Sequence, residues 1–377
     1  MEWPWPRHSV YPAAMNGTGV ARTWTNLTLA MVVVGLGLSG TGCKKLLAKR
    51  LAARDGGVAT AGSAALSGQD LVDEQMQEKL DEYIKCLNTL SSSIHRARGR
   101  YLFYVPKAGP KGTERDADIY VLTSGAAASC ATGVTKSKAM PPPDAKLEGA
   151  GDEYSAAATA VDQVITEMHS YLELKSFKDD KWAKGKAIHP RLIAAFDRFS
   201  AADKTLHDTL DGITKPLNQR ALVRIEKEEG QKFRYWRKKT LINAREMIEA
   251  SDPVGDDQDI DFNLYQASYT DFEKSLDELQ GYGNNHKPDL EAKTNPAWPL
   301  ASSHYETFVR EATDFKVASK EFWRCLRDAP AKAKSPTGKI DMKNMGNCNA
   351  QPAWREAENV IKKYNEFIRA SNNNMFP

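Results

Sequence analysis

The densest set of chemically capable side chains lies in "KSFKDDKWAKGKAIH", residues 175–189. Lysines beside paired aspartates suit a phosphate or sugar site, and an aspartate with a histidine can act as an acid–base pair. The candidate ligand-binding residues are Lys175, Asp179, Asp180, Lys184, Lys186 and His189. The alternative is a charged connection between two helices, in which the aspartates cap or pair locally. We favour this alternative because adjacent unlike charges are typical of a solvated surface.

Other acidic and histidine residues offer weaker metal-binding patterns. His169 with Glu173 and His207 with Asp211 are spaced four apart, which lets two side chains on a helix share a metal. The repeated Glu and Glu-x-x-His motifs of a di-iron bundle are absent from the sequence. The run "DDQDID", residues 256–261, lacks the central glycine and final glutamate of an EF-hand loop. We therefore predict structural pairing and a capping turn, with no metal and no catalytic residue assigned.

Charge gives no general case for nucleic-acid binding. The 377 residues contain 52 Lys and Arg against 49 Asp and Glu, a formal net charge of +3. Residues 232–239, "KFRYWRKK", mix basic and aromatic side chains, but helical spacing directs the aromatic ones to a core face. The sequence also lacks phosphate-loop, dinucleotide, nucleophile-elbow and zinc-protease motifs, so no cofactor is assigned. A binding role is favoured over an enzymatic one.

The N-terminal region determines the expected compartment. In "LTLAMVVVGLGLSGTGCKK", residues 27–45, the uncharged apolar run ends at Leu38. This run is shorter than the roughly 20 residues of a transmembrane helix and suits the core of a signal peptide. Arg22 precedes it, and small residues followed by Cys43 come after it. This order resembles a bacterial lipoprotein signal, in which the cysteine carries acyl chains such as palmitate.

This interpretation divides the chain into three parts. We predict a signal peptide over residues 1–42, a flexible tether rich in Ala, Gly and Ser over 43–69, and a single helical domain over 70–377. The lysines after Cys43 leave open an uncleaved N-terminal anchor, because positive residues tend to stay cytoplasmic. A buried apolar segment, and a frayed first helix in place of the tether, are further alternatives.

The remaining sequence predicts an all-α fold, a bundle of long antiparallel helices. Apolar residues recur at steps of three and four, and Lys and Glu occupy the other faces. One long helix is expected from residue 190 to beyond 242, with a kink at Pro216. Residues 118–123, "DIYVLT", are the single candidate strand, or else a short extended piece. The other helices are expected at about 71–102, 153–174, 262–279, 302–327 and 353–370.

Four cysteines remain once Cys43 is acylated, and four cysteines allow three disulfide pairings. Cys86 lies in the first expected helix and Cys130 in the loop region that follows it. Cys325 ends the fifth helix, and Cys348 lies in the loop before the last one. We predict Cys86–Cys130 and Cys325–Cys348, because each pair pins a mobile loop excursion back onto its own helix. Four reduced, buried thiols are the alternative if the chain stays in the cytoplasm.

Three segments resemble the YiiG-like bacterial lipoproteins: "YIKCLN" at 83–88, "YLELKSFKDDKWAKGKAIHPRLIAAFDRF" at 171–199 and "VIKKYNEFIRASN" at 360–372. The resemblance covers residues 76–372. It implies an all-helical lipoprotein of the cell envelope that faces the periplasm, and it implies no activity. The expected partners are the membrane, through the N-terminal lipid, and an envelope protein. The alternative function is a small-ligand binder or a hydrolase-type enzyme that uses residues 175–189.

Overall fold

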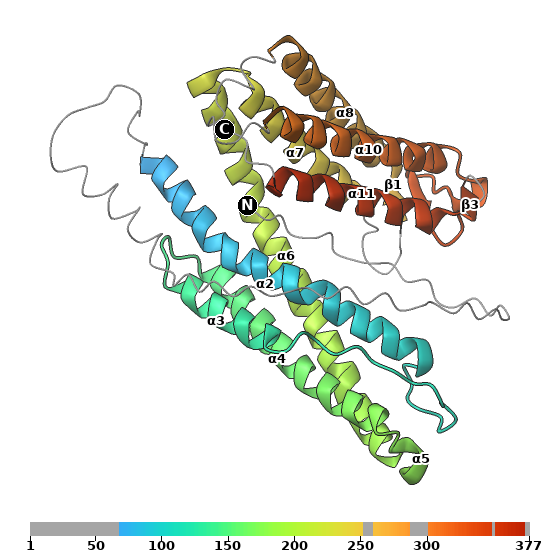
Figure 1. Ribbon diagram of the computed structural model, residues 1–377. Helices are drawn as coiled ribbons and strands as arrows, with labels where there is room; N and C mark the ends of the chain where they lie inside the picture. Colours follow the sequence, from blue (N-terminus) through green and yellow to red (C-terminus); the bar gives the residue numbers. More distant parts are fainter. Residues whose placement is uncertain (1–67, 252–258, 287–300, 349–350, 374–377) are drawn as a thin grey trace. The chain divides into compact units, whose positions relative to one another are not determined.

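The computed structural model describes residues 68–251, 259–286, 301–348 and 351–373 (Figure 1). The predicted signal peptide, Cys43 and most of the tether therefore lie outside the described residues. Within the described ranges, no helix combines the length and apolar content needed to cross a bilayer. The long helices are α2 (Gly68–Tyr104), α3 (Ala126–Lys138), α4 (Ala145–Glu173), α6 (Ala183–Glu229), α7 (Phe233–Ala250), α8 (Phe262–Asn285), α10 (Ala301–Arg327) and α11 (Ala353–Asn373).

Helices α2, α3, α4 and α6 surround one core cluster of buried residues between positions 80 and 217. Contacts between α2 and α6 run in opposite directions along the two helices. His95 meets Asp203 at 3.2 Å, whereas Asp73 meets Arg220 at 2.8 Å near the other end of both helices. The predicted antiparallel, all-α arrangement is confirmed.

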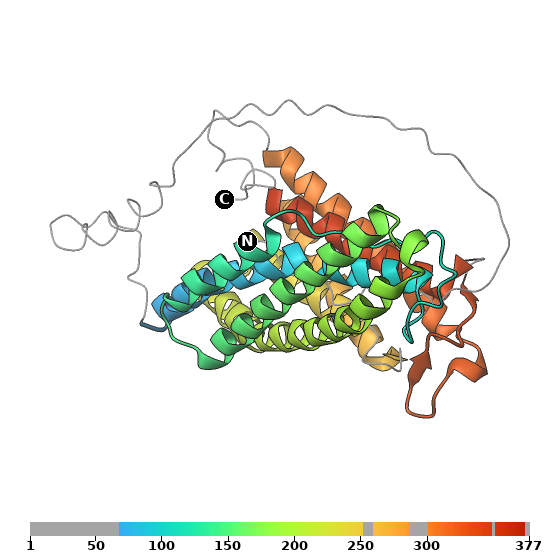
Figure 2. The ribbon, with the colours of Figure 1, turned by 90° about the horizontal axis from the view of Figure 1, so that it is seen from below.

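Helices α7, α8, α10 and α11 surround a second core cluster between positions 233 and 368 (Figure 2). Its centre is aromatic, with Phe315 between Phe272 and Tyr364 at centroid distances of 5.0 and 5.5 Å. Strand β1 (Asp259–Asp261) pairs antiparallel with β2 (Lys339–Asp341), and β3 (Asn347–Cys348) pairs with β4 (Gln351–Pro352). Such short strands hold loops in place and add no layer to the fold.

The prediction of one long helix from residue 190 to beyond 242 is wrong in one respect, because the helix is interrupted between α6 and α7. Gly230 has φ of 75°, and its amide donates to the Glu226 carbonyl, which ends α6. Pro216, the expected kink, lies inside α6. The candidate strand at 118–123 forms no ladder in the described structure and is an extended connection.

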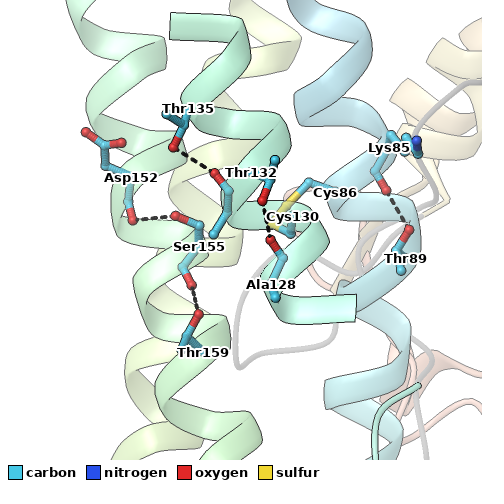
Figure 3. The surroundings of a disulfide bond; sticks show 11 residues. Lys85, Cys86, Thr89, Ala128, Cys130, Thr132, Thr135, Asp152, Ser155 and Thr159 are labelled. Carbon is cyan, nitrogen blue, oxygen red and sulfur yellow. Dashed lines mark hydrogen bonds between the residues drawn. A yellow bond between two sulfur atoms is a disulfide. The ribbon is translucent and has the colours of Figure 1, made fainter. Parts of the chain in front are cut away.

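Both predicted disulfides are confirmed. The Cα atoms of Cys86 and Cys130 are 4.8 Å apart, and those of Cys325 and Cys348 are 5.4 Å apart. The first excursion is not all loop, however, because Cys130 belongs to α3 (Figure 3). This disulfide joins the middle of α2 to α3, so α3 is held against the first core cluster.

A buried lysine fixes the turn between α3 and α4. The Lys79 side chain has no exposed surface, and its Nζ donates to the carbonyls of Met140 and Pro142 at 3.1 and 3.0 Å and to Glu148 at 2.5 Å. The Ser137 hydroxyl donates to the Lys79 carbonyl at 2.6 Å. The buried Lys79 ammonium is therefore bound by three acceptors from the turn and from α4, as burial of a charge requires.

Candidate functional site

The residues singled out by the sequence lie in the connection between α4 and α6 and in the first two turns of α6, which together we call the lysine tip (residues 174–189). It contains one short helix, α5 (Phe177–Asp180). Among the described residues, the non-glycine positions with positive φ all lie here: Lys175 at 53°, Lys181 at 51° and Trp182 at 70°. Such backbone conformations are costly for bulky residues, so the surrounding structure must impose them.

An aromatic cluster imposes this conformation. Trp182 is 1% exposed, and its ring lies 5.2 Å from that of Phe177 and 5.8 Å from that of Tyr171. Gly185 makes room for the cluster, since a Cβ there would lie 2.5 Å from the Trp182 ring. Burial of three aromatic rings provides the free energy that holds the tip in one shape.

Asp180 caps α6. Its carboxylate accepts the backbone amides of Trp182 and Lys184, each at 2.9 Å, and the Tyr171 hydroxyl at 2.8 Å. Desolvation alone would raise the pKa of Asp180, but these hydrogen bonds outweigh it and lower that pKa. The carboxylate is thereby committed to the helix N-terminus, as the connection interpretation anticipates.

His189 is buried and lies between two partners outside the tip. Its Nδ1 lies 2.9 Å from the Tyr101 hydroxyl, and its Nε2 lies 3.0 Å from the Lys107 carbonyl. A neutral ring satisfies both contacts, accepting from Tyr101 and donating to Lys107. Asp180 and His189 thus bind different groups, and the structure does not bring them together as an acid–base pair.

The lysine side chains of the tip, unlike Asp180 and His189, take no part in holding the described part of the fold together. Lys175, Lys184 and Lys186 are exposed, and so is Asp179. Among the described residues, none of these lysines has a carboxylate within 4.0 Å. Farther along α6, Arg191 and Arg198 are both paired, with Glu167 and Glu153 at 2.9 and 2.8 Å. Whether the tip binds a ligand remains a prediction, but its chemistry would be that of free cations.

The weaker candidates have structural partners. His169 lies 3.6 Å from Glu173, the predicted pair. His207 lies beside Asp203 at 3.7 Å, and Asp211 pairs with Arg245 of α7. In the part of the chain that the structure describes, no group of three His, Cys, Asp or Glu side chains is placed to hold a metal ion.

The other two candidate segments also take structural roles. Most of residues 256–261 lie outside the described structure, but Asp261 accepts the Leu264 amide and caps α8. In 232–239, the side chains of Phe233 and Tyr235 are buried and that of Trp236 is partly buried, so the aromatic residues pack in the fold.

A buried cluster of one aspartate and two histidines inside the first core was not predicted from the sequence. Asp203 is 2% exposed and lies between His95 on α2, at 3.2 Å, and His207 on its own helix. Burial would raise the pKa of Asp203, but the hydrogen bond from His95 and the charges of His207 and His95 outweigh it and lower that pKa. The i, i+4 spacing of Asp203 and His207 was visible in the sequence, but the third member is 108 residues away.

Comparison with known proteins identifies relatives without an assigned activity. The family model described as "Protein of unknown function (DUF3829)" matches residues 74–373. The chain is 26% identical over 309 residues to the "Uncharacterized protein YiiG" of Escherichia coli (strain K12), which covers 80% of each chain. No solved structure matches.

Proposed function

The chain belongs to the DUF3829 family, and from that premise we propose that it is a lipoprotein of the bacterial cell envelope. In this proposal Cys43 carries the lipid, and the helical domain faces the periplasm. The domain serves as a binding module for another envelope protein and carries out no reaction of its own.

The observation that carries this proposal is the cysteine pairing. The chain has five cysteines, and the four in the helical domain form two disulfides. Structural disulfides persist in oxidising compartments and are rare in the cytosol. Cys43 is the cysteine left over, and it directly follows the apolar run and small residues of the N-terminal signal.

A binding role is supported by how the titratable groups of the domain are used. Asp180, His189 and Lys79 each hold together two or more segments of the fold, through the hydrogen bonds described above. Groups committed in this way have no free coordination for a substrate. The exposed charges at the lysine tip remain available for contacts with a partner.

The experiment compares wild type with Cys43→Ser in bacteria grown with an alkyne-labelled fatty acid. We expect labelling of the wild type, and loss of labelling with a shift of mass in the variant. The double variant Cys86→Ser, Cys130→Ser is the matched control, since it removes cysteines but keeps the acylation site. Equal labelling of wild type and Cys43→Ser would contradict the proposed anchor.

The binding role is tested separately. Cross-linking in living cells, followed by purification from the envelope fraction, should recover one protein in constant ratio with this chain. Recovery of the chain alone under conditions that cross-link known envelope complexes would contradict the role as a binding module.

A further inference from the structure

The lysine tip gathers positive charge that the rest of the fold does not neutralise. It contains five lysines against two aspartates, in a chain whose overall excess is only +3. The five lysine side chains are exposed, and within the described residues none is in an ion pair: Lys175, Lys178, Lys181, Lys184 and Lys186. With both aspartates ionised, the tip has a formal charge of +3.

A second segment, with equal numbers of basic and acidic residues, lies beside this charge. The loop after α2 lies against the tip, because the Lys107 carbonyl contacts His189, and a Cβ at Gly112 would lie 4.0 Å from the Lys181 carbonyl. This loop carries Lys111, which is exposed. The neighbouring carboxylate of Glu114 is occupied by backbone amides of its own turn at 2.7 to 3.1 Å.

An exposed apolar side chain begins the lysine tip, between the exposed Glu173 and Lys175. Leu174, directly before Lys175, is 77% exposed, whereas the aromatic rings behind the tip are buried. An exposed leucine next to a lysine-rich segment on a rigid support suits an interfacial membrane contact, in which the apolar group inserts and the cations meet anionic headgroups. Because the Trp182 cluster already fixes the backbone, such a contact would cost little ordering of the tip.

We propose that the lysine tip docks onto the surface of an anionic phospholipid bilayer. This inference rests on the proposed lipid anchor, which keeps the domain beside a membrane and so raises the effective concentration of the tip there. The anchor is attached before α2, and the tip contacts the other end of that helix through Tyr101 and His189. The 37 residues of α2 span about 55 Å. The roughly 25 residues from Cys43 to α2 extend to at most about 85 Å, so the tip can reach the membrane that holds the anchor.

The test measures how fast lysines react with a membrane-impermeant acetylating reagent. The full chain is reconstituted in vesicles of phosphatidylcholine, or of phosphatidylcholine mixed with phosphatidylglycerol, and peptides are quantified by mass spectrometry. We expect Lys175 and Lys186 to react at least about threefold more slowly in the anionic vesicles than in phosphatidylcholine alone. High salt should remove the difference. Lys85, which is exposed on α2, serves as the internal reference and should react equally in both.

Two triple variants separate the tip from general charge. Replacing Lys178, Lys181 and Lys184 with glutamine should weaken docking about 100-fold and abolish the protection of Lys175 and Lys186. The matched control removes the same charge from exposed lysines elsewhere and should keep the protection: Lys146→Gln, Lys274→Gln, Lys332→Gln. Circular dichroism of both variants verifies that the fold is intact.

Several results would overturn the inference. Equal labelling in the two vesicle compositions would do so, as would protection in phosphatidylcholine alone or protection that survives in the tip variant. Protection by soluble heparin without protection by anionic vesicles would assign the tip to a charged polymer instead. Acylation of Cys43 is scored from the mass of its peptide. If the chain is not acylated, the same labelling is measured with vesicles added to the protein, so failure of the anchor and failure of docking are distinguishable.

Discussion

Replacing His189 with alanine should lower the free energy of unfolding by about 3 kcal/mol. The ring is 5% exposed, and its Nδ1 accepts the hydrogen bond of the Tyr101 hydroxyl, whose residue has no exposed surface. Leaving that hydroxyl without a partner costs about 1–2 kcal/mol. The lost packing and the cavity cost a similar amount. The Lys107 carbonyl belongs to the loop after α2, where a water molecule can replace the His189 ring as its hydrogen-bond donor.

Urea unfolding followed by far-ultraviolet circular dichroism without reductant measures this loss. Tyr101→Phe is the companion variant and should cost about 1 kcal/mol. The double variant should cost less than the sum, with a coupling of about 1 kcal/mol, because the two side chains share one hydrogen bond. Additive costs would refute the bridging role of His189. A variant that keeps its stability but loses partner binding would instead place His189 in a functional site.

Three further predictions concern the two ends and the centre of the first core. Removing the Cys86–Cys130 disulfide, which closes a 44-residue separation, should destabilise the oxidised protein by about 4 kcal/mol in the chain-entropy model, measured without reductant as the difference in unfolding free energy between wild type and the double variant Cys86→Ser, Cys130→Ser. The pKa of Asp203 is lowered by folding, so this group stabilises the fold above its ordinary pKa near 4, and that contribution is lost as the pH falls through the lower folded value. Unfolding free energies of Asp203→Asn should therefore be lower at neutral pH and change less below pH 4, and an identical acid profile for wild type and variant would contradict this. Gly185→Ala should cost about 1–3 kcal/mol through its clash with the aromatic cluster, whereas Gly149→Ala, in open space on α4, should be neutral or stabilise by up to about 1 kcal/mol in thermal melts.

The sequence predicted the parts of the fold that depend on local periodicity. Long amphipathic segments gave α2, α4, α8, α10 and α11, since an apolar stripe at helical spacing must be buried against another helix. The disulfides could also be predicted, because each pair joins a helix to the region that directly follows it.

Helix α3 was missed because its sequence has little apolar content. Val134 is its one large aliphatic side chain, and the helix is held by long-range contacts, including the disulfide at Cys130 and the hydrogen bond from Ser137 to Lys79. Intrinsic propensity is a weak guide where tertiary contacts decide.

The roles of the candidate site residues could be predicted only in part. Capping by Asp180 was among the expected roles, since aspartate before a helix commonly caps it. The partners of His189 could not be found, because Tyr101 is 88 residues away and no spacing rule connects them. The left-handed backbone at Trp182 was equally hidden, since no sequence pattern signals a strained bulky residue.

The pairing of the cysteines has a consequence for biogenesis. Each disulfide joins cysteines that are neighbours in order along the helical domain, Cys86 with Cys130 and Cys325 with Cys348. In a chain exported N-terminus first, both Cys86 and Cys130 emerge before either cysteine of the second pair. An oxidase that joins thiols in order of appearance therefore makes the native bonds directly. If the chain is exported as proposed above, its maturation should depend on a thiol oxidase and be indifferent to loss of a disulfide isomerase.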